Sequence, residues 1–584
     1  MRKRSLLWAL IGPVLLLGVA ARARAANAGW RLITHPDGGL FVGDVVSFEV
    51  VPPADWQPAP EEGAPRLQLR IAIEKGDGRE ESEFAWEAPV LPHGIDGRRA
   101  AVFAWVWKTR GLRPGAYPVD VIYQGRVLWQ TQVALAPGEQ RPWWEEGVAW
   151  SHRTWPEAEA VVLTRTPAAR DLALIRHVLT AIRRDLARLE GFPQTQDPAP
   201  VVLMPRLLGQ GGFAGARLWV TYADRDATGT WFPVVARHEM VHWLDRQRAA
   251  DYRALMLVEG LAVYLAGGHY KPEPLAPRAA ALLLLDRYIP LTTLADGDFY
   301  GYQHEIAYLE AGALVEYMVQ RWGWDAFAAF YWGMDPKAGD GPAVILDAGL
   351  RRHLGVDLET LAADFEAYLR AQPDAAAWTE DVRLTVALYE ALRRYQRQMD
   401  PSAYYGTAWL PDLTTMQTVG AVADAVRGPF SLAHVTAELL LQEAQIALDA
   451  KEYDRATRNL AAVNALLDAE AAGQAEPWRA HPEAERVAAW AQAARDCDVE
   501  PTDLVRRADG SVWVWGWPRG GHPEPAAVRI AIEEDGESGS DDQNPNGRPA
   551  DVTCRVDLSK GLVWTAVPQP VYLPGPRHGP RHGR

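Results

Sequence analysis

The stretch from Arg237 to Trp243, Arg-His-Glu-Met-Val-His-Trp, constrains the fold more than any other part of this 584-residue sequence. Residues four apart lie on one face of a helix, so the imidazoles of His238 and His242 can reach a single metal ion. Glu239 is offset enough to contact a water on that ion instead of the ion itself. Pro233, which suits the first position of a helix, lies just upstream. We therefore expect a helix that begins near Pro233 and carries two zinc ligands and a general base.

A third ligand is needed, because a catalytic zinc site usually has three protein ligands and one open position. Sixteen residues separate His242 from Glu259, which lies in a second helical pattern closed by Gly267-Gly268. A helix, a turn and a returning helix would bring Glu259 back to the metal. Asp245 is the alternative, either as the third ligand or as an acceptor that orients His242, and we favour the orienting role.

The segments His-Glu-Met-Val-His and Glu-Gly-Leu-Ala, which begin at His238 and Glu259, resemble the gluzincin metallopeptidases, most closely their peptidase MA-like branch. The resemblance extends to the helical pattern that starts at Tyr308. It implies a small sheet whose edge strand borders the substrate cleft, packed on the helices that carry His238, His242 and Glu259. It also implies a Tyr or His opposite the metal as a donor to the oxyanion. Tyr308 is the candidate for that role, and Tyr317 is the weaker alternative.

Other zinc enzyme classes fit less well. A metzincin requires Gly and His at the positions that Asp245 and Arg248 occupy. Alanyl-type aminopeptidases carry a Gly-x-Met-Glu-Asn motif, which the nearest segment, Gly209 to Gly215, lacks. We therefore expect an endopeptidase, in which zinc acidifies a water and Glu239 moves its proton to the leaving amine. Two alternatives stay open: an inactive binding or adhesion protein on a peptidase scaffold, and a zinc hydrolase of non-peptide amides.

The N-terminal segment has the layout of a secretory signal peptide. Arg2-Lys3-Arg4 precedes an apolar run from Leu6 to Ala20, and small residues up to Ala28 offer a cleavage site. The alternative is a retained anchor, although the run is shorter than the ~20 residues that span a bilayer. We expect an exported or cell-surface protein with no membrane span in the mature chain. In such an oxidising compartment Cys497 and Cys554, the only cysteines, could form a local disulfide.

Net charge limits the partners. The formal charge is −15 and the pI is near 5.5, so the chain has no overall basic field for nucleic-acid phosphates. We expect a peptide or protein substrate, no nucleic acid, and a cell-surface component that would bind the β modules.

His269 and His304, which flank the predicted site in sequence, are interpreted as polar surface residues.

The patterns along the chain predict a multidomain protein. Short segments with period-two alternation and Gly or Pro turns dominate the N-terminal region, which resembles immunoglobulin-like β-sandwich modules of exported bacterial proteins. Strands and long helices alternate in the central region, where Leu218 to Tyr222 is the expected edge strand. The predicted organisation is a signal peptide (1–28), an Ig-like β-sandwich (29–140), an α+β gluzincin-type metallopeptidase domain (149–372), a helical extension (373–493) and a small C-terminal β module with a disordered tail (494–584).

Overall fold

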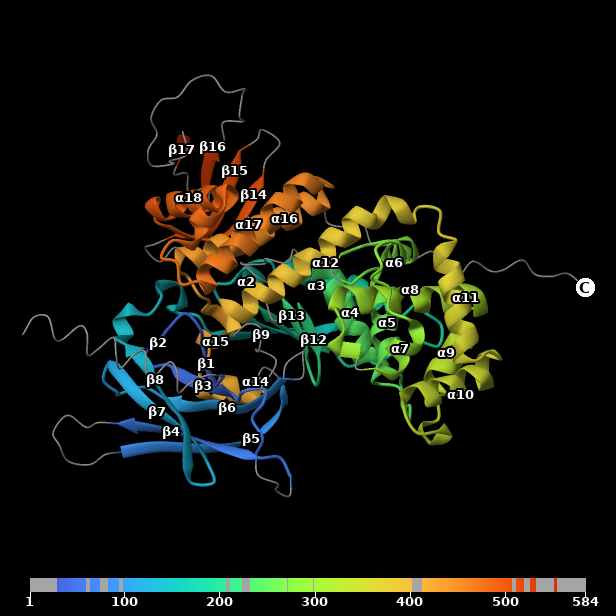
Figure 1. Cartoon of the computed structure of the whole chain (residues 1–584), viewed down its shortest axis with the longest axis horizontal. Coiled ribbons are helices and arrows are strands. Elements are labelled where there is room, and N and C mark those ends of the chain that lie inside the picture. Colours follow the sequence, from blue (N-terminus) through green and yellow to red (C-terminus); the bar gives the residue numbers. More distant parts are fainter. Residues whose placement is uncertain are drawn as a thin grey trace, which may run out of the picture. The chain divides into compact units, whose positions relative to one another are not determined.

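The computed structural model describes most of the chain, which divides into two compact units (Figure 1). The first unit comprises residues 1–141 and 408–427, and the second comprises residues 142–407 and 428–584. The predicted signal peptide lies outside the described residues. The described residues are 29–58, 63–73, 82–93, 98–205, 211–222, 232–269, 271–297, 299–401, 412–506, 511–518, 526–531 and 551–553.

The first unit is built on a curled sheet of eight strands in the order β1-β3-β6-β5-β4-β7-β8-β2. All neighbours are antiparallel except β2 and β8. The long strand β5 joins the two halves, because its residues 82–89 pair with β4 and its residues 90–93 pair with β6. The strands are β1 (Arg31–His35), β2 (Leu40–Phe41), β3 (Val45–Val51), β4 (Arg66–Ile73), β5 (Ser82–His93), β6 (Arg98–Lys108), β7 (Gly115–Tyr123) and β8 (Arg126–Ala136), followed by η1 (Gly138–Gln140).

The period-two patterns explain this sheet. Val46, Phe48 and Val50 share one side of β3 and are completely buried, but so are Ser47 and Glu49 on the other side, so both sides of this strand are covered. Gln124 and Gly125 both have positive φ angles, 49° and 72°, which is the type I′ turn that joins β7 to β8 in a hairpin. On β7, Tyr117, Val119 and Val121 are buried and alternate with exposed or half-buried residues, so the period-two pattern marks the side of this strand that faces the core.

Two short helices from a distant part of the sequence belong to the same unit. They are α14 (Leu413–Val419) and α15 (Ala423–Val426). Trp105 Nε1 donates to Asp424 Oδ2 at 2.9 Å, and Arg427, which is fully buried, lies 2.6 Å from Asp44 Oδ2. This segment lies within the range predicted as a helical extension, but it packs on the N-terminal sheet.

The second unit contains a five-stranded sheet in the order β12-β13-β11-β10-β9. Strands β10, β11 and β13 are parallel, and β9 and β12 are antiparallel to their neighbours. The prediction that Leu218 to Tyr222 forms the edge strand is wrong, because β12 pairs with β13 on its outer side. The strands are β9 (Trp150–Trp155), β10 (Ala158–Leu163), β11 (Ala199–Met204), β12 (Gly212–Ala214) and β13 (Leu218–Thr221).

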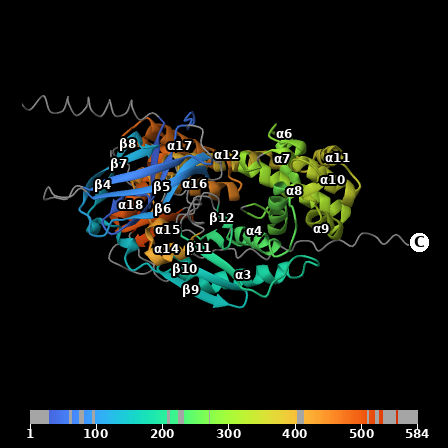
Figure 2. The ribbon, with the colours of Figure 1, turned by 90° about the horizontal axis from the view of Figure 1, so that it is seen from below.

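Helices pack beside this sheet and form most of the core of the unit (Figure 2). In α3, Ile175, Leu179, Ile182 and Leu186 are buried at helical spacing. Figure 1 shows α4, α5 and α8 packed next to one another. The helical elements up to residue 370 are η2 (Trp143–Glu145), α2 (Pro167–Arg170), α3 (Leu172–Leu186), α4 (Phe232–Asp245), α5 (Leu255–Ala266), α6 (Leu275–Leu284), α7 (Leu291–Asp296), η3 (Phe299–Gly301), α8 (His304–Trp322), α9 (Trp324–Trp332), η4 (Pro336–Ala338), α10 (Pro342–Leu354) and α11 (Leu358–Arg370).

The rest of the unit is helical and ends in a small antiparallel sheet of four strands in the order β14-β15-β16-β17. Cys497 is disulfide-bonded, and Cys554 lies outside the described residues. Among the helices that the structure describes, none has the length and apolarity needed to cross a membrane. The elements are α12 (Ala375–Gln398), α16 (Leu432–Asp449), α17 (Tyr453–Ala471), η6 (Pro477–Ala480), α18 (Pro482–Asp496), β14 (Val499–Arg506), β15 (Val512–Pro518), β16 (Ala526–Ala531) and β17 (Asp551–Thr553).

Candidate metal centre

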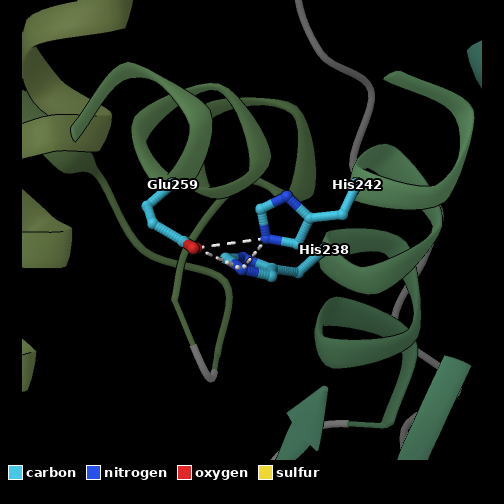
Figure 3. Close-up of side chains that lie close together, drawn as sticks. All are labelled: His238, His242 and Glu259. Atoms are coloured by element: carbon cyan, nitrogen blue, oxygen red, sulfur yellow. Dashed lines mark hydrogen bonds and ion pairs between the residues drawn. The ribbon is translucent and has the colours of Figure 1, made fainter. Parts of the chain in front are cut away.

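Three side chains predicted as zinc ligands converge on one point between α4 and α5 (Figure 3). His238 and His242 extend from α4, and Glu259 extends from α5. The two Nε2 atoms lie 3.0 Å apart, and Glu259 Oε2 lies 3.2 Å from His238 Nε2 and 3.1 Å from His242 Nε2. All three residues are buried. The helix, turn and returning helix predicted from the sequence therefore place the three donor atoms in a triangle.

Two glycines allow α5, the helix that carries Glu259, to pack closely against α8. A Cβ atom on Gly260 would lie 2.4 Å from the carbonyl oxygen of Ala311 on α8. A Cβ atom on Gly312 would lie 2.4 Å from Val263 Cγ1 on α5. The two helices thus cross in backbone contact, which explains why Gly follows Glu259 directly. At the end of α5, Gly267 adopts the left-handed conformation of a C-cap, with φ of 77°.

The geometry and chemistry of these donors fit a zinc ion. Two ligand atoms that each lie about 2.0–2.1 Å from a tetrahedral zinc ion are about 3.3 Å apart. The observed separations of 3.0–3.2 Å are close to that value. Two imidazole nitrogens and one carboxylate oxygen also form a donor set that catalytic zinc sites use. Within the described residues, this is the only group of three or more His, Cys, Asp or Glu side chains arranged to hold a metal.

Burial and mutual charge determine the protonation of the ligands. The pKa of His238 is lowered to about 4, chiefly by burial; the hydrogen bond to Glu259 opposes this shift and the charge of His242 adds to it. Burial would also lower the pKa of His242, but the adjacent Glu259 carboxylate outweighs it and raises this pKa. Burial opposes ionisation of Glu259 as well, yet the two imidazoles hold its pKa well below the usual range. The site therefore keeps the Glu259 carboxylate and a neutral His238, which are forms that bind a cation, whereas the raised pKa of His242 favours its protonated form, which would release its proton when a metal binds.

Glu239 lies beside the ligands and against the edge strand. Burial raises the pKa of Glu239 to about 8, with His242 opposing and Glu259 adding to the shift. A Cβ atom on Gly212 of β12 would lie 2.5 Å from Glu239 Oε1 and 2.8 Å from Val235 Cγ1, so a larger residue at this point of the strand would displace these side chains. The sequence did not predict β12, because a three-residue strand with one glycine gives no alternation pattern.

Tyr300 is a site residue that the sequence analysis missed. Its hydroxyl donates to Glu259 Oε1 at 2.8 Å. Burial, together with the charge of Glu259, raises the pKa of Tyr300, so the hydroxyl stays protonated and acts as the donor. Tyr300 lies in η3, a single turn between α7 and α8, where no periodic pattern marks a residue as buried or exposed.

Tyr308, the residue expected to act as the oxyanion donor, lies near the site. Its ring centre is 6.1 Å from that of His238, with 27° between the ring planes. Tyr317 lies nine residues further along α8, where its ring contacts Phe365 and Tyr368 of α11. Of the two tyrosines considered for the oxyanion, Tyr308 is therefore the one beside the ligands.

The interpretation of His269 and His304 as surface residues is wrong, because each is 4% exposed. Their rings lie 5.1 Å apart, and the ring of Tyr308 lies 4.3 Å from that of His269 and 4.0 Å from that of His304. His269 Nδ1 also lies 3.2 Å from Glu305 Oε1. The two histidines extend the polar interior from the ligands toward α8. Their burial follows from tertiary packing that a single helix-end histidine does not reveal.

Asp245 was expected to orient His242 or to be the third ligand, but its side chain accepts hydrogen bonds from α9. Its Oδ2 accepts from the Tyr331 hydroxyl at 3.0 Å, and its Oδ1 accepts from Trp332 Nε1 at 2.7 Å. Arg253 Nε lies 2.9 Å from Oδ2. Asp245 therefore connects the end of α4 to α9 and is not among the three converging side chains.

Comparisons with known proteins give no independent assignment. No family model matches the chain, no curated protein matches its sequence, and no solved structure matches its fold. The function must therefore be argued from the geometry and chemistry of this site.

Proposed function

We propose that the protein is a zinc-dependent endopeptidase whose ion is held by His238, His242 and Glu259. One observation carries this proposal: two imidazole nitrogens and a carboxylate oxygen converge at 3.0–3.2 Å, with the Glu239 carboxylate beside them on the same helix. Three protein donors leave a tetrahedral ion one position for water or substrate, as catalytic sites require. A structural zinc site would instead use four protein ligands.

The reaction assigned to the site is hydrolysis of a peptide bond. When bound, the ion would lower the pKa of a water toward about 7 and polarise the scissile carbonyl. Glu239 accepts the proton of the attacking water and transfers it to the nitrogen of the leaving amine. A dication held at the three donor atoms would also lower the pKa of Glu239, which would favour the carboxylate form that a base needs. Tyr308 is the proposed donor to the oxyanion, because its ring stacks beside that of His238.

The position of β12 supports a peptide as substrate. This strand pairs with β13 on one side, and its Gly212 lies against Glu239. An extended peptide that adds to the other side of β12 would pass next to the base through main-chain hydrogen bonds. A small sheet with such an edge, packed on the ligand helices, is also what the resemblance to peptidase MA-like gluzincins implies. We propose that family relationship for the second unit and an immunoglobulin-like origin for the curled sheet.

We further propose that the protein works outside the cytoplasm. The N-terminal sequence has a signal-peptide layout, and Cys497 is disulfide-bonded, as is usual in oxidising compartments. The curled sheet and the C-terminal sheet would then position the enzyme on a cell-surface component or on a protein substrate.

The test combines metal analysis with peptide cleavage. Purified protein is expected to bind one zinc ion per chain and to cleave members of a mixed peptide library at internal bonds. Glu239→Gln is expected to keep the ion and to lose about 10²–10⁴-fold in rate, because only the proton transfer is removed. Glu366→Gln, which changes an exposed glutamate of α11, is the matched control and should cleave at the wild-type rate.

Two results would refute the endopeptidase assignment. Bound zinc without any cleavage that depends on Glu239 would favour a binding protein on a peptidase scaffold. Cleavage of simple amides but not of peptides would favour a hydrolase of non-peptide amides.

A further inference from the structure

The two carboxylate oxygens of Glu259 have different environments. Oε2 lies 3.2 and 3.1 Å from the two imidazole nitrogens, at the position where the ion would bind. Oε1 accepts a hydrogen bond of 2.8 Å from the Tyr300 hydroxyl. One oxygen is thus available to the metal, while the other is held by a neutral donor.

Tyr300 is itself held in position by its neighbour. Phe299, the preceding residue in η3, is 2% exposed and its ring centre lies 5.1 Å from that of Tyr308 on α8. The rings of Phe299 and Tyr300 lie 5.9 Å apart at 76°. The buried Phe299 therefore fixes the turn, and the turn directs the Tyr300 hydroxyl toward α5.

We propose that Tyr300 is a positioning residue that restricts Glu259 to binding the ion through Oε2 alone. This proposal rests on the zinc site proposed above. A carboxylate that binds through both oxygens would occupy the position that water or substrate needs, whereas one held at Oε1 leaves it open. Hydrogen bonds to a ligating carboxylate also orient it before the metal arrives, and their loss typically reduces metal affinity about 10–100-fold.

The test is the zinc affinity of Tyr300→Phe, measured by competition with a chromophoric chelator. Phenylalanine keeps the ring and removes only the hydroxyl, so the affinity is expected to fall about 10–100-fold. Tyr302→Phe is the matched control, because it removes a tyrosine hydroxyl from the same segment. The Tyr302 hydroxyl lies beside Gly297: a Cβ atom built on Gly297 would be 2.5 Å from it. The control should bind zinc as the wild type does.

A second measurement separates positioning from a general loss of packing. With cobalt in place of zinc, visible absorption reports the coordination geometry. Tyr300→Phe is expected to give the weaker bands of a higher coordination number, because Oε1 is then free to join Oε2. Tyr302→Phe should keep the wild-type spectrum, and thermal unfolding of the metal-free proteins should give similar midpoints for all three.

Three outcomes are distinguishable. Weaker zinc binding with a changed cobalt spectrum supports the proposal. Unchanged affinity and spectrum in Tyr300→Phe overturn it while leaving the zinc site intact, even if catalysis falls. A wild-type protein that binds no zinc overturns the zinc site itself and this proposal with it.

Discussion

Two clusters in the second unit each bury carboxylate groups, but different partners stabilise these groups in each cluster. In the first cluster, Arg278, which is 2% exposed, pairs with buried carboxylates. Glu273 Oε2 lies 2.7 Å from Arg278 Nε, although the two atoms are not aligned as a hydrogen bond, and Asp381 pairs with Arg278 Nη1. Around Glu259 the partners are two imidazoles and the Tyr300 hydroxyl; the pKa of His238 is lowered to about 4 and that of His242 is raised. The first cluster is complete within the chain, whereas the second presents a triangle of donors suited to an external cation. Similar burial therefore indicates stability in the first case, whereas in the second it is consistent with the metal binding that we propose.

The largest expected effect on stability comes from substituting Arg278 in the first cluster. Arg278→Met removes the arginine that pairs with Glu273 and Asp381 and leaves these carboxylates buried with only Lys271 Nζ, 3.9 Å from Asp381 Oδ1, as a cation among the described residues, which should cost about 3–5 kcal/mol in the free energy of unfolding. Zinc should not restore this loss. Arg383→Met is the control on the same helix as Asp381, because Arg383 forms an exposed pair with Glu380 and should cost about 1 kcal/mol or less. Urea denaturation measures both, and equal losses would contradict the distinction.

The second effect appears only when zinc is present. At a zinc concentration 100 times the dissociation constant, the wild type should gain about 2.7 kcal/mol, because the ion binds only the folded state. Glu259→Ala should gain almost nothing at the same concentration. Thermal unfolding with and without zinc measures the difference. If Glu259→Ala gained as much as the wild type, the ion would be bound elsewhere, and the contrast between the clusters would fail.

The same contrast shows what the sequence could predict. The convergence of His238, His242 and Glu259 was predicted because spacing of four residues and a Gly cap are local signals, and both α4 and α5 form where those signals predict them. Tyr300 was not found, since a one-turn element between helices has no period and its contact with Glu259 joins residues 41 apart. The burial of His269 and His304 was mispredicted for the same reason, because it depends on which distant segments pack nearby. The edge position predicted for Leu218 to Tyr222 was wrong for a different reason: β12, which pairs outside it, has only three residues and gives no alternation pattern.

A third buried group, Glu310, shows another way to accommodate a carboxyl group. It is 1% exposed on α8; its Oε1 accepts from the Ile289 backbone N–H at 2.8 Å, and its Oε2 has no hydrogen-bond partner among the described residues. Burial raises the pKa of Glu310 well above its usual range, with the Ile289 bond opposing the shift. The raised pKa favours the neutral carboxyl form of Glu310, which does not need a cationic partner such as the arginine of the first cluster.

The smallest effect should follow from making Glu310 permanently neutral. A folded-state pKa above the unfolded value means that stability is fully present below about pH 4.5 and decreases as pH rises toward the folded pKa. Glu310→Gln should therefore match the wild type at pH 4 and exceed it at pH 8, by on the order of 1 kcal/mol once the added amide is counted. Urea denaturation at the two pH values measures this gain, with Glu359→Gln at the exposed start of α11 as the control. An equal difference at both pH values would mean that packing, and not ionisation, separates Glu310 from Gln, because only ionisation depends on pH.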